Sequence, residues 1–151
     1  VVFIRMEVLI MKELYLSGKE LDGLKEALEN TRGVEALTYG SAMGEGFDFS
    51  VNCLRVEYNP KKIDITELLK IYFAAVDPYS PPETPSMSTA VLFKSGEDAM
   101  QIEYYLRFLQ MRGAEPAAAL GELIVNDSIT DGVETRPLLT LCGRLKSFTA
   151  L

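Results

Sequence analysis

The chain has 151 residues, of which 48% are hydrophobic and 25% are charged, and its formal net charge at pH 7 is -7. This length and composition are typical of one globular domain with its own core, so we treat residues 1–151 as a single domain. The acidic balance argues against binding to nucleic acid or to an anionic membrane surface. Histidine is absent, which excludes histidine-based catalysis and histidine metal ligands.

The cysteine content bears on redox chemistry and metal binding. Cys53 and Cys142 are too few for a zinc site of the common types, and they lie far apart in the sequence. We therefore expect two reduced thiols in a cytoplasmic protein, with no bound metal and no cofactor. A redox pair formed by Cys53 and Cys142 is the alternative.

Apolar residues recur with a period of two or of 3.6 residues, and this pattern divides the chain into expected elements. The segments with a strand pattern are 11–17, 33–42, 49–59, 88–94 and 121–127. The segments with a helix pattern follow Ser17, Asp64 and Ser95 and end near Asn30, Val76 and Arg112. Residues 1–10 are expected to be an extension, residues 77–86 are proline-rich and irregular, and residues 128–151 show no clear period and are expected to be an irregular tail.

The order of these elements indicates a fold class. Strand, helix, strand, strand, helix and strand follow one another, with a further helix and strand. This is the split β-α-β, ferredoxin-like plan of an α+β protein. It predicts an antiparallel sheet with helices packed on one face.

The stretch SGKELDG (17–23) lies where the first strand turns into the first helix. Such corners combine free backbone N–H groups with the positive end of a helix dipole, and they often hold a reactive group or an anion. Here the spacing of Ser17 and Glu20 fits a capping box, which gives Glu20 a purely structural role.

Three segments, in the same order, resemble the peptide methionine sulfoxide reductases of the A type. The first, LYLSGKELDGLKEALENTRGV (14–34), is similar to that family's strand, G-C-F-W-G turn, helix and P-G-V. The second, CLRVEYNPKKIDITELLKIYFAAVDP (53–78), resembles a strand ending in Y-D-P, an I-x-x-x-E-L-L helix and H-D-P. The third, STAVLF (88–93), resembles R-S-A-I-F, and the whole resemblance covers roughly residues 12–125.

The family's chemistry uses a cysteine thiolate at the helix N-terminus, which attacks the sulfoxide sulfur, and a strand glutamate, which protonates the oxygen. In this chain the nucleophile position is Glu20 and the acid position is Asn52, while Leu21 and Asp22 replace the aromatic pair that cages the substrate methyl group. The two loops that carry the family's other pocket residues are shortened to MGEGFD or replaced by YSPPETPSMS. The resemblance thus implies the fold without a catalytic residue, and a vestigial pocket at Gly18, Glu20, Leu21, Asp22, Ser41 and Asn52.

Two further features allow alternative interpretations. Cys53 follows Asn52 and should point to the opposite side of the strand, so we expect it to be packed, and we interpret Cys142 as incidental. The last helix carries two apolar stripes, one of them Met100, Tyr104, Phe108 and Met111, and the other Ala99, Ile102, Leu106 and Leu109. Such a wide arc usually indicates burial against both a sheet and a tail, whereas an exposed arc would indicate a homodimer or a partner surface.

We therefore expect a protein of the reductase fold without reductase chemistry, which binds a peptide, a small ligand or a protein partner near the former pocket. The first alternative is a reductase with a relocated cysteine, and it requires Cys53 or Cys142 to be exposed near Glu20. The second alternative is an unrelated ferredoxin-like regulatory or dimerisation domain. It predicts an apolar dimer face and no pocket at the corner.

Overall fold

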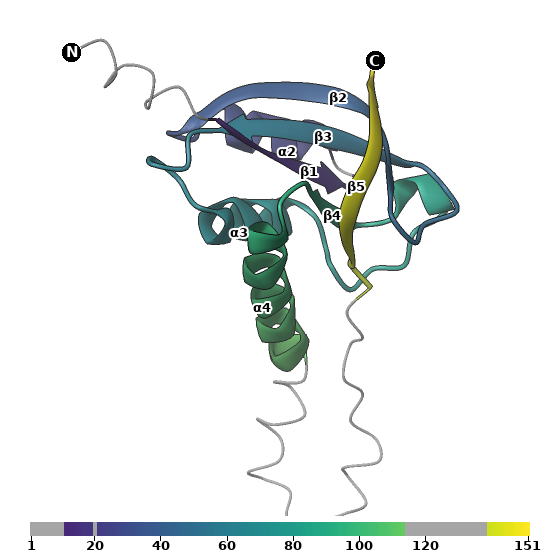
Figure 1. The fold of residues 1–151 in the computed structure, drawn as a ribbon. Helices are drawn as coiled ribbons and strands as arrows, with labels where there is room; N and C mark the ends of the chain where they lie inside the picture. The colour runs from purple at the N-terminus through teal and green to yellow at the C-terminus, as the bar shows by residue number, and fades with distance from the viewer. Residues whose placement is uncertain (1–10, 20, 114–138) are drawn as a thin grey trace, which may run out of the picture.

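The strands of the described residues close into a barrel in the order β1-β3-β2-β5-β4 (Figure 1). The computed structural model describes residues 11–19, 21–113 and 139–151. The elements are β1 (Lys12–Ser17), α2 (Leu21–Glu29), β2 (Val34–Gly44), β3 (Val51–Tyr58), α3 (Ile65–Ala75), the short 3-10 helix η1 (Pro85–Met87), β4 (Ala90–Phe93), α4 (Gly96–Gly113) and β5 (Leu141–Ala150). The expected extension at 1–10 and the expected strand at 121–127 lie outside the described residues.

The sheet is mixed, because β4 and β5 run parallel while the other neighbouring strands run antiparallel. The prediction of a purely antiparallel sheet is therefore wrong. The parallel pair is made by β5, which lies in the segment 128–151 that was expected to be an irregular tail. This strand pairs with β2, where Thr149 lies opposite Ser41, and with β4, where Leu141 lies opposite Ala90. The β5 strand is therefore what closes the barrel.

The other described helices and strands lie close to the segments predicted for them, but the predicted start of the first helix needs a correction. Ser17 does not cap α2, because it is the last residue of β1 and its Oγ donates a hydrogen bond to the carbonyl of Ser88 at 2.7 Å. The predicted capping box is therefore wrong, and Glu20 lies outside the described residues. By contrast, Asp64 caps α3 as predicted, since its carboxylate accepts a hydrogen bond from the Glu67 N–H at 2.8 Å.

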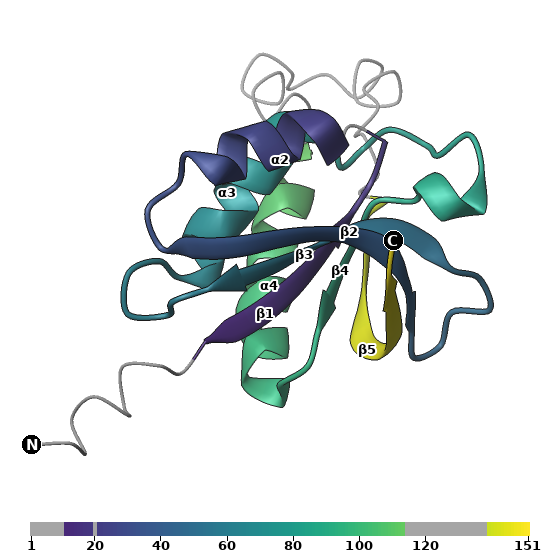
Figure 2. The same cartoon turned by 90° about the horizontal axis from the view of Figure 1, so that it is seen from above.

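Two apolar layers lie on the two sides of the barrel wall. Along β3, Leu54, Val56 and Tyr58 face outward, and Val51 and Cys53 face inward, so the predicted alternation is confirmed. The outer layer also contains buried residues of α2, α3 and α4, which pack on the outside of the barrel (Figure 2). Each large apolar side chain buried in this way stabilises the fold by about 1.5–3 kcal/mol.

Closure of the barrel depends on a close approach between β2 and β5. A Cβ added to Gly40 would lie 2.4 Å from Cζ of Phe148 and 2.5 Å from the carbonyl oxygen of Thr149. The Phe148 ring lies over this glycine and contacts the ring of Tyr15, with 5.2 Å between their centroids. A side chain at position 40 would therefore push β5 away from the wall. Within the described ranges, no helix is both long and apolar enough to cross a membrane.

Candidate functional site

The corner between β1 and α2 is held in place by α3. Tyr72 of α3 donates a hydrogen bond to the carbonyl of Ser17, the last residue of β1. Val76, which follows α3, packs against the turn, and a Cβ added to Gly18 would lie 2.9 Å from Cγ1 of Val76. The glycine predicted for this turn is therefore required by a close approach. Glu20, at the expected nucleophile position, lies outside the described residues, so its predicted role stays a prediction.

A cavity of about 190 Å³ opens beside this corner. Its lining comes from the turn after β1, the end of α3, and the loop that leads to β4. The lining residues are Lys19, Val76, Asp77, Ser80, Met87 and Thr89. Sequence reasoning located the corner but did not single out Ser80, Met87 or Thr89. These three residues could have been found from the proline-rich loop, because this loop connects α3 to β4 and both of its ends lie beside the corner.

Polar groups of both charges line the cavity. The Lys19 Nζ lies 3.6 Å from Oε1 of Glu83, whose side chain is 75% exposed, so this ion pair contributes about 1 kcal/mol or less. Asp77 accepts a hydrogen bond from the Tyr79 N–H at 2.9 Å. Thr89 is only 7% exposed, and its carbonyl accepts a hydrogen bond from the Leu141 N–H at 2.8 Å.

Three of the predicted pocket residues come together at one end of the sheet. Asn52 lies opposite Ser41 on the face that carries Leu54. The pairing of β1 with β3 ends at Ser17 and Cys53, and Gly18 and Asn52 are the residues that adjoin this last pair along the chain. Asn52 is exposed and Ser41 is half-buried, and neither lines the cavity. The structure thus gathers these residues at the rim of the corner.

The other two described pocket residues turn away from the cavity. Leu21 is half-buried and packs on the outer apolar layer. Asp22 is exposed and accepts a hydrogen bond from the Tyr39 hydroxyl on β2, and this bond raises the pKa of Tyr39 to about 12. Neither side chain forms an apolar cage beside Lys19.

The two thiols lie in different layers of the wall. Cys53 is buried inside the barrel, as predicted, and this burial raises its pKa to about 12, although Arg55 acts in the opposite direction. Cys142 lies on β5 opposite Val91 and packs against the outer layer, and burial raises its pKa to about 11. Both thiols are free, so a redox pair between them finds no support in this arrangement.

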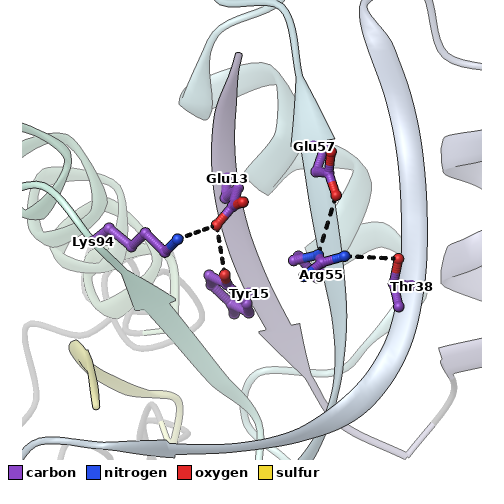
Figure 3. A network of polar contacts seen from close by, with 6 residues as sticks. All are labelled: Glu13, Tyr15, Thr38, Arg55, Glu57 and Lys94. Atoms are coloured by element: carbon purple, nitrogen blue, oxygen red, sulfur yellow. Dashed lines mark hydrogen bonds and ion pairs between the residues drawn. The ribbon is translucent and has the colours of Figure 1, made fainter. Parts of the chain in front are cut away.

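A second group of polar side chains lies at the other end of the barrel (Figure 3). Glu13 accepts hydrogen bonds from Tyr15, and it pairs with Lys94, each at 2.6 Å. Burial acts to raise the pKa of Glu13, but the bonds from Lys94 and Tyr15 outweigh it, so the pKa lies below its usual value. Arg55 Nε lies 3.2 Å from a Glu57 oxygen. Glu13, Tyr15, Arg55 and Glu57 alternate along β1 and β3 with the outward-facing apolar residues, so with Lys94 they form a polar rim over the inner layer.

Comparison with known proteins identifies the fold. No family model matches the sequence, and no curated protein matches it. Among solved structures, Mxr1 from Saccharomyces cerevisiae in reduced form is similar with a TM-score of 0.60 and 18% identity, over 91% of this chain and 78% of Mxr1. Its unusual oxidized form gives a TM-score of 0.59 and 20% identity, over 91% and 74%.

A bacterial structure gives the same result. Methionine sulfoxide reductase A of Corynebacterium diphtheriae is similar with a TM-score of 0.57 and 18% identity, over 74% of this chain and 59% of that protein. These neighbours are methionine sulfoxide reductases of the A type, so the reductase-like fold implied by the resemblance is confirmed. At these identities the similarity concerns the fold alone.

Proposed function

We propose that this protein is a binding module built on the fold of the A-type methionine sulfoxide reductases, without their chemistry. Its ligand, a peptide, a small molecule or a protein partner, occupies the cavity beside Lys19. The observation that carries this proposal is a cavity of about 190 Å³ at the corner, with no thiol among its described lining residues. A cytoplasmic location without nucleic-acid or membrane partners belongs to the same proposal, supported by the free thiols and the net charge of -7.

The state of the two cysteines supports this assignment against a reductase with a relocated nucleophile. A nucleophilic cysteine needs a lowered pKa and access to its substrate. Burial has the opposite effect on Cys53 and Cys142, whose pKa values it raises to about 12 and about 11. Asn52, at the expected acid position, has no proton to release at neutral pH.

An activity assay tests this proposal directly. The protein is incubated with a peptide that contains methionine sulfoxide and with dithiothreitol, and the methionine formed is measured by mass spectrometry. We expect no turnover above that of buffer alone. Turnover that is lost in Cys53→Ser or in Cys142→Ser would instead establish the reductase with a relocated cysteine.

One observation favours a dimerisation domain as a second candidate function. On α4, Met100, Tyr104 and Phe108 form an apolar stripe, and these side chains are 75%, 77% and 46% exposed. The usual expectation for such an arc, burial against both a sheet and a tail, therefore does not hold for this stripe. Figure 1 shows α4 extending away from the barrel beyond α3. Exposed Glu103 and Arg107 flank the stripe. In a twofold, antiparallel pair of α4 helices, Glu103 of each copy would lie opposite Arg107 of the other.

Sedimentation analysis tests the second candidate. If α4 forms the dimer face, the wild-type protein sediments as a dimer, and Tyr104→Lys shifts it to the monomer by placing a charge in the apolar interface. Ala27→Lys adds the same charge to an exposed position of α2 and should leave the dimer intact. A wild-type protein that remains a monomer at high concentration would contradict this candidate.

A further inference from the structure

We propose that the open edge of β2 binds an extended, basic peptide segment of a partner protein, which adds a strand beside residues 34–38. This interaction surface is separate from the cavity beside Lys19, and it does not depend on the proposed function. It is argued from the strand pairing, from a groove along the edge and from the charges around that groove.

One side of β2 is paired along only part of its length. On one side β3 lies opposite residues 34–42, whereas on the other side β5 pairs only from Gly40 onward. The last bond on that second side is donated by the Leu151 N–H to the Tyr39 carbonyl at 3.0 Å. Among the described strands, none lies beside residues 34–38 on this side, so the first part of β2 extends past β5 as an open edge (Figure 2).

The open edge presents backbone groups that a further strand can bind. In an antiparallel sheet the N–H and C=O of one residue point to the same side, and successive residues alternate between the two sides. Tyr39 points toward the side of β5, so Leu37 points its N–H and C=O to the same side, where no described strand receives them. Thr38 points instead toward β3, where it lies opposite Arg55. Unpaired edge groups of this kind are what an extended peptide uses to add a strand to a sheet.

A groove of about 340 Å³ between α2 and β2 follows this edge. Its lining residues are Lys25, Glu29, Val34, Glu35, Ala36 and Leu37. Residues directly opposite one another in paired strands share a face of the sheet, so the peptide residue opposite Leu37 would project on the side of α2. Leu37 is half-buried there and packs against the outer apolar layer. An apolar peptide side chain at this position would therefore extend that layer.

The charges around the groove favour a basic residue at the next position of the peptide on the same face. The Lys25 Nζ lies 3.4 Å from Oε1 of Glu29, so the charge of this lysine is already balanced within α2. Glu35 is exposed at the bulge of β2 and forms no ion pair with another described residue. Asp22 and Glu26 add two exposed carboxylates on α2. The added strand runs antiparallel to β2, so a lysine or arginine two residues after the one opposite Leu37 would lie beside Glu35.

The same charges argue against a second copy of this chain as the occupant. A twofold pair of β2 edges would place two acidic grooves side by side on a short edge, each with Glu29 and Glu35. The register of β2 also shifts between Val34 and Ala36. A bulge and an exposed charge are typical of edges that are protected against self-association. A partner of opposite charge is therefore the occupant that this edge fits.

Titration with a blocked peptide tests the inference. Acetyl-Thr-Thr-Val-Thr-Lys-Thr-Thr-amide, whose valine is to lie opposite Leu37, is added to the full chain, and binding is measured by chemical-shift changes and by amide hydrogen exchange. The Leu37 amide should exchange rapidly in the free protein and at least about tenfold more slowly with saturating peptide. The Thr38 amide, which points toward β3, should be protected in both states.

Two changes in the peptide test the strand pairing and the charge. Methylation of the valine nitrogen removes the donor to the Leu37 carbonyl and should abolish binding. Methylation of the threonine nitrogen between valine and lysine is the matched control, because that N–H points away from β2, and binding should persist. Replacement of the lysine by glutamate should weaken binding at least about fivefold.

A charge reversal in the protein assigns the basic residue to its partner. Glu35→Lys should weaken binding of the lysine peptide at least about fivefold and strengthen binding of the glutamate peptide. Glu26→Lys makes the same change at an exposed residue of α2 that does not line the groove, so it should keep the wild-type preference for the lysine peptide. The amide spectrum of each variant verifies its fold.

Four results would overturn the inference. The first is no change at Leu37 with the lysine peptide at millimolar concentration, and the second is equal binding of the two methylated peptides. The third is a Leu37 amide that is already protected in the free protein at low concentration, which would mean that the chain covers its own edge. The fourth is protection of Leu37 that grows with protein concentration in the absence of peptide, which would identify a second copy as the occupant.

Discussion

At the scale of single residues, Cys53 shows how burial controls chemistry. Its thiol lies inside the barrel, and its pKa is raised to about 12, so at pH 8 it remains protonated and shielded. We predict that Cys53 does not react with Ellman's reagent in the folded protein and reacts fully once guanidinium has unfolded it. Comparison of Cys53→Ser with Cys142→Ser assigns each thiol. Rapid labelling of the folded protein that disappears in Cys53→Ser would contradict this prediction.

Tyr15 gives a second prediction at the same scale. Its hydroxyl donates to Glu13 at 2.6 Å beneath the polar rim shown in Figure 3, and its ring is buried inside the barrel. Tyr15→Phe should therefore lower the free energy of unfolding by about 1 kcal/mol, measured by urea denaturation. Tyr104→Phe is the matched control, because Tyr104 is 77% exposed on α4 and should show no loss. Equal stability of the two variants would show that the bond to Glu13 contributes nothing.

Residues whose environment follows from the local pattern were predictable, and those defined by a distant partner were not. The inward side of Cys53 follows from alternation with Leu54 and Val56, and Asp64 caps α3 through its immediate neighbours. Ser17 has the local spacing of a cap, but its hydroxyl bonds to Ser88, which lies 71 residues away in the chain. Thr89 belongs to the candidate site for the same kind of non-local reason.

At the scale of elements, β5 is the one described strand that sequence reasoning missed. Its ten residues are half-buried or exposed, so they carry no continuous apolar stripe. Leu145 and Phe148 face the inner layer, but polar residues, Arg144, Lys146 and Ser147, lie beside and between them in the strand. The strand is defined by its partners β2 and β4, and pairing between segments so far apart leaves little trace in local periodicity.

Glycine substitutions test the closure made by β5. Gly40→Ala places a Cβ 2.4 Å from the Phe148 ring, so it should destabilise the protein by about 1–3 kcal/mol. Gly23→Ala is the matched control, since Gly23 lies in α2 with nothing within 4 Å of an added Cβ. Because alanine favours a helix over glycine, this second change should stabilise the protein by up to about 1 kcal/mol. Thermal denaturation measures both, and a neutral Gly40→Ala would contradict the close approach.

At the scale of the whole molecule, the resemblance to the A-type reductases anticipated the fold better than the order of elements did. The order predicted an antiparallel sheet, whereas the strands close into a mixed barrel with β5 between β2 and β4. Closure requires a second apolar layer inside the wall, and both layers bury titratable side chains, Cys53 and Tyr15 in the inner layer and Tyr58 and Tyr72 in the outer layer. Cys53, Tyr15, Tyr58 and Tyr72 all have raised pKa values, in each case chiefly because burial disfavours the charged form.

These raised pKa values predict that the protein loses stability in alkali. In the unfolded chain the thiol titrates near its usual pKa of 9.0 and the phenols near 10.0, while the folded protein holds all four protons to higher pH. Above about pH 9 the unfolded state therefore binds fewer protons, so the free energy of unfolding falls as the pH rises. Below that pH this contribution is complete and constant. Urea denaturation at a series of pH values should show a plateau followed by a steady decline.

Tyr58 provides the variant that tests this cause. Its hydroxyl is buried without a hydrogen-bond partner within the described residues, so Tyr58→Phe removes no bond and should leave the stability at neutral pH unchanged or slightly higher. The variant has one fewer phenol to ionise on unfolding, so its stability should fall less steeply above about pH 10. Tyr104→Phe, on the exposed face of α4, should keep the wild-type slope. If Tyr58→Phe also keeps that slope, burial of this phenol is not a source of the alkaline loss.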